Sequence, residues 1–120
     1  MVIEDDQDLR DSLQRLLQEK YTISMAANGE EGLKLVQEIK PDLILSDVMM
    51  PIMDGFELCK QLKRKKETSC IPIILLTAKI NDKDYLEGLN CGADAYITKP
   101  FNFNVLQANI DMVISNRKRV

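Results

Sequence analysis

Histidine is absent from the sequence, and its absence removes several kinds of chemistry. A serine or cysteine nucleophile activated by histidine is excluded, and so are the usual zinc sites and an internal phosphohistidine. Tryptophan is absent as well. The three cysteines, Cys59, Cys70 and Cys91, have neither metal-ligand spacing nor a paired arrangement. We therefore expect reduced and mostly buried thiols.

Long apolar runs are also missing. No run approaches the ~20 residues that a membrane-spanning helix needs, and the first residues do not resemble a signal peptide. The net charge of -3 argues against a large basic surface for nucleic acid. With 120 residues, 45% of them hydrophobic and 29% charged, the chain can form one globular domain with a single core.

Short apolar segments alternate with amphipathic ones along the chain. The predicted strands are residues 1–3, 21–26, 43–45, 72–76 and 95–98. The predicted helices are residues 8–19, a segment entered through Asn28-Gly29, a segment after Gly55, residues 82–89, and a last helix around 106–113. This alternation is typical of an α/β fold with a parallel sheet covered by helices on both faces.

Both ends of the chain have unusual features. The first predicted strand is short for a strand inside a parallel sheet, and residues 116–120 form a basic run without a helix stop signal. We expect residues 1–120 to be a single domain of a longer protein.

Polar residues follow the predicted strands. Glu4 and Asp5 come after the first, Asp47 after the third, Thr77 after the fourth and Lys99 after the fifth. In an open parallel sheet, ligands bind beyond the carboxyl ends of the strands. Such an oxygen-rich, thiol-free cluster suits Mg²⁺. An aspartate beside Mg²⁺ and lysine can act as a nucleophile toward phosphorus.

Four segments in this order carry a resemblance to a known family: VIEDDQDLR, PDLILSDVMMPIMDG, PIILLTA and GADAYITKPF. Over nearly its whole length the chain resembles the receiver domain of bacterial two-component response regulators. The resemblance implies a doubly wound, flavodoxin-like sheet of five strands in the order 2-1-3-4-5 with five helices. That order comes from the family, whose chemotaxis member is a standard example of it, and not from the sequence pattern.

The resemblance also implies a role for each residue at the ends of the strands. Asp47 would be the phosphoacceptor. Mg²⁺, or alternatively Mn²⁺, would be bound by Asp5, Asp47 and the backbone carbonyl of Met49, with Glu4 acting through water. Glu4 stands where the family more often has aspartate, and two methionines precede the proline of the following loop; neither departure removes a type of ligand.

The remaining roles concern binding of the phosphoryl group and the response to it. Thr77 would turn inward to hydrogen-bond the phosphoryl group, Ala78 would leave room for it, and Lys99 would pair with one of its oxygens. Tyr96 would be the aromatic switch. Structural roles would fall to Pro100, after a cis peptide bond, to Pro51 and to Gly55, which we expect to supply the loop conformation.

By the same resemblance, the domain would take a phosphoryl group from a sensor histidine kinase or a histidine phosphotransfer domain. Phosphorylation would alter the face formed by the fourth helix, the fifth strand and the fifth helix, through which the domain could also form a homodimer. A covalently linked DNA-binding domain, or a hybrid kinase, would carry the output. The isolated domain would not be an enzyme beyond its own phosphorylation and slow dephosphorylation, would be cytoplasmic, and would contact neither nucleic acid nor membrane.

Two other functions share some of these residues. Haloacid-dehalogenase-type phosphohydrolases use a second acid two residues after the nucleophile, and Met49 occupies that position here. A pseudo-receiver, which binds partners without accepting phosphate, typically lacks an acid or the lysine. Simpler interpretations remain for single residues: Asp5, Asp6 or Asp8 as a helix cap, Asp47 as a turn residue, Tyr96 as a half-buried strand residue, and residues 63–66 as a solvated helix end.

Overall fold

The computed structural model describes residues 1–78, 86 and 90–118, without the side chains of the last two. Its five parallel strands form one sheet in the order β2-β1-β3-β4-β5. The strands are β1 (Val2–Ile3), β2 (Met25–Ala26), β3 (Ile44–Asp47), β4 (Ile73–Thr77) and β5 (Ala95–Thr98). The expected α/β class and strand order are confirmed.

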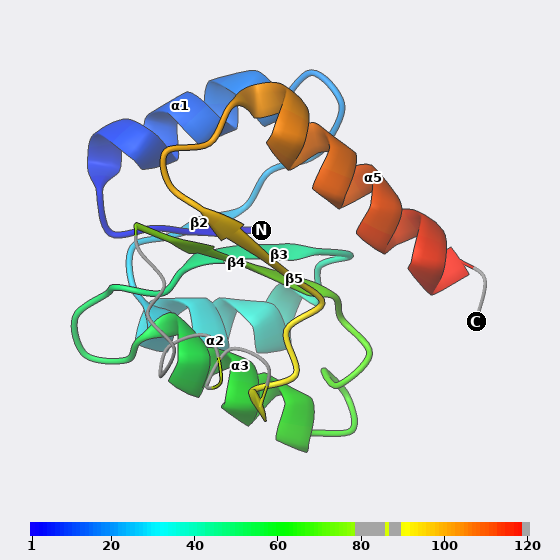
Figure 1. Ribbon diagram of the computed structural model, residues 1–120. Helices are drawn as coiled ribbons and strands as arrows, with labels where there is room; N and C mark the ends of the chain where they lie inside the picture. The colour runs from blue at the N-terminus through cyan, green and yellow to red at the C-terminus, as the bar shows by residue number, and fades with distance from the viewer. Residues whose placement is uncertain (79–85, 87–89, 119–120) are drawn as a thin grey trace.

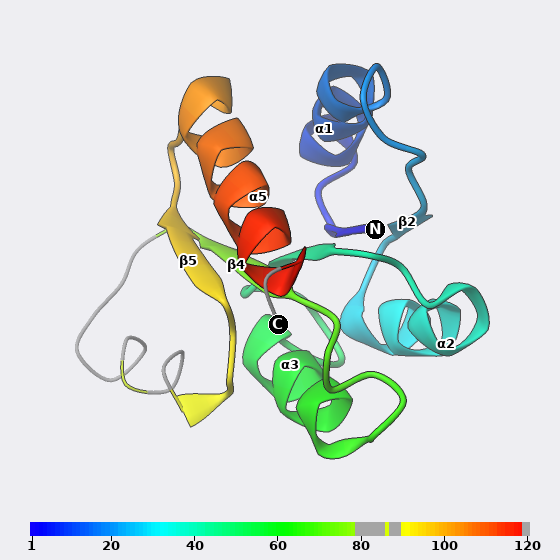
Figure 2. The same cartoon turned by 90° about the vertical axis from the view of Figure 1, so that its right-hand side faces the viewer.

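Helices cover both faces of this sheet, as the alternating pattern predicts. The described helices are α1 (Gln7–Leu17), α2 (Gly29–Ile39), α3 (Gly55–Arg64) and α5 (Phe103–Lys118). Figure 1 shows α1 and α5 on one face and α2 and α3 on the other, and the turned view of Figure 2 shows the same two layers. The helix predicted at residues 82–89 lies outside the described residues.

The strands divide their side chains between two hydrophobic clusters. Ile73 and Leu75 of β4 belong to the cluster that includes Phe56, whereas Ile74 and Leu76 belong to the cluster that includes Leu106. Successive side chains of a strand point to opposite faces, so a strand buried on both faces is apolar at every position. Each such side chain contributes roughly 1.5–3 kcal/mol through its burial. This packing fixes the register, and with it the edge of the sheet at which the strands end.

Two strands differ most from their predicted boundaries. The second strand contains only Met25–Ala26, and not residues 21–26, because the strand it pairs with, β1, is itself only two residues long, Val2–Ile3. Of the preceding residues, Ser24 still accepts a backbone hydrogen bond of 2.8 Å from Val2 of β1. Tyr21 binds elsewhere: its hydroxyl accepts a hydrogen bond of 2.8 Å from Nε2 of Gln107. The third strand extends further than predicted and includes Asp47 as its last residue.

Polar side chains begin three of the helices. Asp6 accepts hydrogen bonds from the backbone N–H groups of Asp8 (2.9 Å) and Leu9 (3.3 Å) at the start of α1. Asn28 and Asp54 each accept one of 2.8 Å, at the starts of α2 and α3. A cap of this kind contributes about 1 kcal/mol. The capping interpretation of Asp6 is therefore correct.

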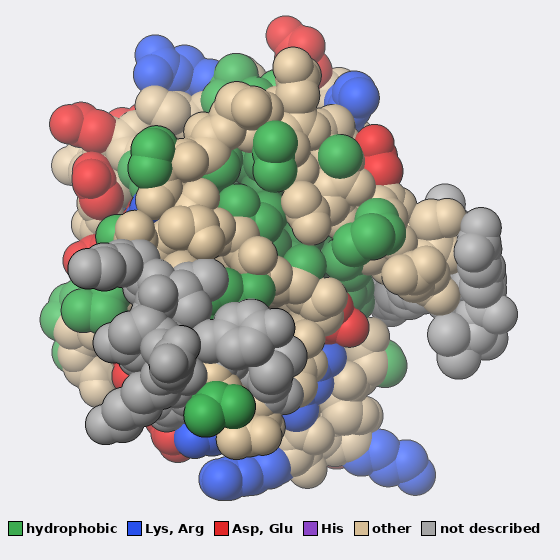
Figure 3. Space-filling view, in the orientation of Figure 1, with side chains coloured by type: hydrophobic (Ala, Val, Ile, Leu, Met, Phe, Trp, Pro, Cys, Tyr) green, Lys and Arg blue, Asp and Glu red, His purple; other side chains and the backbone are tan. Residues whose placement is uncertain are grey.

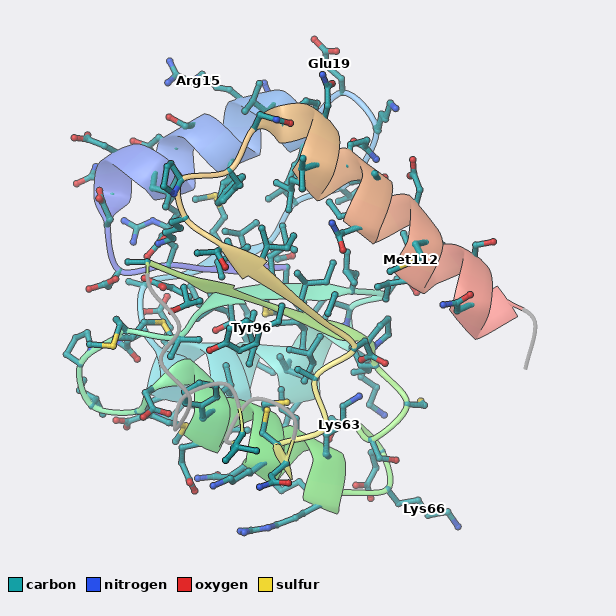
Figure 4. The ribbon with its side chains drawn as sticks, viewed as in Figure 1. Arg15, Glu19, Lys63, Lys66, Tyr96 and Met112 are labelled. Carbon is teal, nitrogen blue, oxygen red and sulfur yellow. The ribbon has the colours of Figure 1, made fainter. Side chains whose placement is uncertain are left out.

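Lys63 corrects the expectation that residues 63–66 are simply a solvated helix end. Its ammonium group donates to the carbonyl oxygens of Ser69 (3.2 Å) and Ile71 (2.8 Å) and lies 3.4 Å from Oδ2 of Asp94. This lysine thus ties α3 to the segments that precede β4 and β5. Figure 4 shows Lys66 pointing away from the molecule. The thiols of Cys59 and Cys91 are buried, whereas that of Cys70 is exposed.

Gly55 corrects a second expectation, because it does not supply an unusual loop conformation. It is the first residue of α3 and does not have a positive φ. A Cβ atom at this position would lie 2.5 Å from the backbone oxygen of Asp47 and 2.9 Å from Cα of Val48. Glycine is required here because α3 begins against the backbone of the residue that follows β3.

We expect Gly55→Ala to lower the free energy of unfolding by about 3 kcal/mol, because the added methyl group must displace the backbone around Asp47. Gly32→Ala is the matched control, since the nearest atoms to a Cβ there belong to the Ile3 side chain and not to the backbone. Urea unfolding of both variants measures the difference. Equal and small losses of the free energy of unfolding in the two variants would show that the backbone around Asp47 can shift at little cost.

Candidate acidic site

Three carboxylates meet at the edge of the sheet. Glu4, Asp5 and Asp47 each place a carboxylate oxygen within 4.8 Å of the others. The register explains this convergence, because Ile3 of β1 lies opposite Ser46 of β3 and the next residue of each strand is an acid. Glu4 is 1% exposed and Asp47 6%, whereas Asp5 faces solvent. Glu4 and Asp47 therefore form the buried part of this cluster, and Asp5 forms its solvent-exposed part.

Lys99 brings an ammonium group to the same place. Its Nζ lies 3.0 Å from Oε1 of Glu4 and 3.3 Å from Oδ2 of Asp47. The residue follows β5, which is separated from β3 by β4, so the long side chain crosses the end of one strand. The peptide bond to Pro100 is cis, as expected. Lys99 therefore links the end of β5 to both buried acids.

The charges at this site are out of balance. Among the described residues, three carboxylates face one ammonium group here. Burial, together with the neighbouring Asp47, raises the pKa of Glu4 to about 7, although Lys99 opposes the rise. Burial lowers the pKa of Lys99, but the hydrogen bond to Glu4 and the charge of Asp47 outweigh it and give a net increase. The site thus holds an excess of negative charge.

The carboxylate of Asp47 is largely buried. Its side chain is 8% exposed, and Oδ1 lies 3.4 Å from the backbone nitrogen of Met49, a long contact. The hydroxyl group of Ser46 donates to the backbone oxygen of Asp47 at 3.0 Å. The Ser46 hydroxyl thus binds the backbone of Asp47, and the Asp47 carboxylate lies next to Lys99.

Thr77 lies beside this cluster on the neighbouring strand. It is the last residue of β4 and is 3% exposed, one position beyond the Leu76 that pairs with Asp47. Its carbonyl oxygen accepts a hydrogen bond from the backbone nitrogen of Lys99. Ala78 follows at the exposed edge. The structure therefore brings Thr77 to the same end of the sheet as the acids and the lysine.

Tyr96 lies deeper, in the half-buried part of β5. Its ring stacks on Phe56 of α3, with ring centres 6.1 Å apart and planes 14° from parallel. Figure 4 shows the Tyr96 side chain on the side of the sheet that carries α2 and α3. Because alternate residues share a face, Thr77 points to the same side as Leu75, which belongs to the cluster that Tyr96 contacts. The threonine and the tyrosine thus share one layer.

Arg10 is a site residue that the sequence pattern did not reveal. Its guanidinium Nη1 donates a hydrogen bond of 2.8 Å to the backbone oxygen of Glu4. The backbone N–H of Asp6 makes a longer contact, 3.4 Å, with Oε2 of Glu4. Arg10 thus fixes the backbone that carries Glu4. The only signal for this role was its position one turn into α1, where many arginines simply face solvent.

Comparison with known proteins gives a consistent result. Residues 1–111 match the family described as "Response regulator receiver domain". The transcriptional regulatory protein AfsQ1 of Streptomyces coelicolor is 45% identical over 120 residues, which cover 99% of this chain and 52% of that protein. Histidine kinase P4 of Formosa agariphila is 43% identical over 120 residues, covering 100% of this chain and 9% of that protein.

Solved structures agree with these sequence matches. The crystal structure of the signal receiver domain of a signal transduction histidine kinase from Syntrophus aciditrophicus is 38% identical, with a TM-score of 0.92. The match covers 99% of this chain and 91% of that one. By contrast, this chain spans about half the length of AfsQ1 and less than a tenth of the histidine kinase.

Within the described residues, no helix combines the length and apolarity that crossing a membrane requires.

Proposed function

Because the chain belongs to the response regulator receiver domain family, we propose that it serves two-component signalling by accepting a phosphoryl group on Asp47. One observation carries this assignment of the site: Nζ of Lys99 lies within 3.3 Å of Asp47 and 3.0 Å of Glu4, with Asp5 in the same cluster. Four side chains from three separate segments would not converge in this way for capping alone.

The acidic cluster also fits a divalent cation. Its donors are carboxylate oxygens, which Mg²⁺ and Mn²⁺ prefer, and the negative charge exceeds what Lys99 can neutralise. Asp5, Asp47 and the Met49 carbonyl would hold the ion directly, with Glu4 acting through water. When bound, the cation would neutralise charge on the oxygens of the transferred phosphoryl group.

The protein residues then have distinct tasks in the transfer. A carboxylate oxygen of Asp47 attacks the phosphorus of a phosphohistidine on the donor; the oxygen–phosphorus bond forms while the phosphorus–nitrogen bond breaks. The imidazole nitrogen keeps the electron pair of the broken bond and takes up a proton from water. Lys99 pairs with a phosphoryl oxygen, and the Thr77 hydroxyl donates to another. Ala78 leaves that hydroxyl room to approach.

The response to phosphorylation would pass through Thr77 and Tyr96. Movement of Thr77 toward the phosphoryl group opens space in the layer that it shares with Tyr96, and the ring can follow. This would change the surface around β5, at which a second copy or an output domain could bind. The fourth helix, which the family places at this surface, falls outside the described residues.

The relatives of this chain include a transcriptional regulator and a histidine kinase, and they suggest the partners of this domain. A sensor histidine kinase or histidine phosphotransfer domain would donate the phosphoryl group in the cytoplasm. AfsQ1 is a transcriptional regulator and P4 a histidine kinase, so a DNA-binding output and a hybrid kinase are both consistent with this receiver. We propose no direct contact of this domain with nucleic acid or membrane.

The two competing functions are less well supported. A dehalogenase-type phosphohydrolase would need an acid at position 49, where a methionine stands with 70% of its surface exposed. A pseudo-receiver would have lost an acid or the lysine, whereas Glu4, Asp5, Asp47 and Lys99 are all present and close together. Accordingly, we do not expect turnover of phosphate monoesters.

We expect the purified chain to take up one phosphoryl group from acetyl phosphate with Mg²⁺ present, and none after a chelator removes the cation. The reason is that the surplus charge of the acids would repel an anionic donor. Intact-protein mass spectrometry measures the uptake. Equal uptake with and without the cation would contradict the metal assignment, and steady release of phosphate from monoesters would favour the phosphohydrolase.

A further inference from the structure

Two of the three cysteines come together in the fold. Cys59 lies on α3, and Cys91 lies 32 positions further along the chain, in the segment that leads into β5. The Sγ atom of Cys59 donates to the backbone oxygen of Cys91 at 3.2 Å. Figures 1 and 2 both draw the segment before β5 beside α3. No sequence pattern predicted this pair.

Both thiols lie inside the protein. Cys59 is 0% exposed and Cys91 3%, both are reduced, and both belong to the hydrophobic cluster that includes Phe56. Buried cysteines commonly serve as small apolar side chains. This pair differs from that case, because the two thiols are also close enough to hydrogen-bond to each other. Two sulfur atoms in such contact can react together.

The two thiols differ in how readily they ionise. The hydrogen bond from Cys59 lowers the pKa of Cys91 to about 7, although burial opposes the change. The same hydrogen bond, together with burial, raises the pKa of Cys59. The charge of Lys60 also favours the Cys91 thiolate, and Figure 3 shows lysine and arginine side chains where Figure 1 draws α3. Because the thiolate is the reactive form, Cys91 is the more reactive of the two.

We propose that Cys59 and Cys91 form a redox-responsive pair: a hydroperoxide oxidises Cys91, and Cys59 then closes a disulfide that ties α3 to the segment before β5. Where thiols are kept reduced, a disulfide of this kind is transient and typically senses oxidants. The inference goes beyond the proposed function and does not depend on it, because oxidation of these thiols does not involve Asp47.

The chemistry proceeds in two steps, with hydrogen peroxide as the simplest oxidant. The sulfur of the Cys91 thiolate attacks one peroxide oxygen; the sulfur–oxygen bond forms, the oxygen–oxygen bond breaks, and the leaving hydroxide takes up a proton to become water. The sulfur of Cys59 then attacks the sulfenic acid, and the hydroxide that leaves takes the thiol proton. Two thiols and one peroxide thus give one disulfide and two waters. Hydrogen peroxide is small, so local opening of the chain admits it.

The disulfide would form next to the aromatic pair of this layer. Cys59 lies one turn beyond Phe56 on α3, and residues three apart on a helix are neighbours. Phe56 stacks on Tyr96 of β5. A bond between residues 32 positions apart also restricts the unfolded chain. We therefore expect the oxidised chain to be more stable to heat.

The test uses the chain with Cys70→Ala as its starting point. This change removes the exposed thiol, which could otherwise link two copies, and leaves the buried pair intact. Cys59→Ala and Cys91→Ala are then each made in that background. The three proteins are treated with hydrogen peroxide in the presence or absence of dimedone, which traps sulfenic acids. Intact mass, peptide mapping and Tm are measured before and after dithiothreitol.

We expect the Cys70→Ala chain to lose the mass of two hydrogen atoms and to give one linked peptide containing Cys59 and Cys91. Its Tm should rise by about 10 °C, and dithiothreitol should reverse both changes. Cys59→Ala should stop at a sulfenic acid on Cys91, which dimedone captures. Cys91→Ala should react about tenfold more slowly or less, because the Cys59 thiol keeps its proton.

Several results would overturn the inference, and the first needs no substitution within the pair. Cys59 and Cys91 that stay reduced under conditions that oxidise Cys70 of the unaltered chain would be packing residues only. A link between two copies, or sulfinic acid on Cys91 beside a reduced Cys59, would show that the two sulfurs cannot meet. Equal reaction of the two single variants would contradict the role of Cys91. A lower Tm after oxidation would show that the bond disrupts the contact with α3.

Discussion

Asp47→Asn is expected to abolish phosphoryl uptake and at the same time to stabilise the chain. The amide cannot act as the nucleophile, so uptake from acetyl phosphate should vanish. It also removes one of the like charges around Glu4, which is 1% exposed and already in an acidic environment. We expect the free energy of unfolding to rise by about 1 kcal/mol and Tm by about 4 °C, measured with a chelator present.

Asp54→Asn is the matched control for this change. It removes the same charge from the loop that follows Asp47, but asparagine can still accept the hydrogen bond from the backbone nitrogen of Glu57. Uptake and stability should therefore stay close to those of the unaltered chain. A fall in Tm for Asp47→Asn would mean that Lys99 alone balances the acids, and the case for a cation at this site would weaken.

Lys99→Met should lower the rate of phosphoryl uptake by about a hundredfold while leaving Asp47 in place. Methionine preserves the length of the side chain but removes the charge that would face the phosphoryl oxygens, and loss of one such group typically costs this much. Rates of uptake from acetyl phosphate, followed by mass spectrometry, measure the effect.

Lys34→Met controls for the loss of a lysine charge. Lys34 is paired with Glu30 at 3.9 Å on the surface of α2, with 77% of its side chain exposed, so its removal should not alter uptake. If Lys99→Met kept the full rate, its contacts with Glu4 and Asp47 would be structural only. Increased stability of Lys99→Met would also be unexpected, because two buried acids would lose their cation.

The sequence was informative about the sheet and the acidic edge because both depend on local patterns. Continuous apolar runs such as residues 73–76 are typical of strands buried on both faces, and parallel strands end at one edge. The placement of Glu4, Asp47 and Lys99 follows from these two facts together with the family order. The roles of individual residues at that edge, which the family implies, remain predictions.

Other features depend on contacts between distant segments, which no local pattern records. Gly55 was expected to shape a turn, but the close backbone of Asp47 is what excludes a side chain. Lys63 was expected to face solvent, but its ammonium group donates a hydrogen bond to the carbonyl oxygen of Ile71. Nothing in the sequence predicted the positive φ of Ile52, 73°, since it stands in a loop where any residue type can occur.

The most direct test of the account is to locate the phosphoryl group. An acyl phosphate is reduced by borohydride, so treatment of the chain after acetyl phosphate and Mg²⁺ should leave a reduced residue at position 47, identified by peptide mass spectrometry. Modification of Asp47 and of no other acid is the expected result. Modification at Asp5 or Glu4, or a chain that carries no acyl phosphate at all, would contradict the assignment.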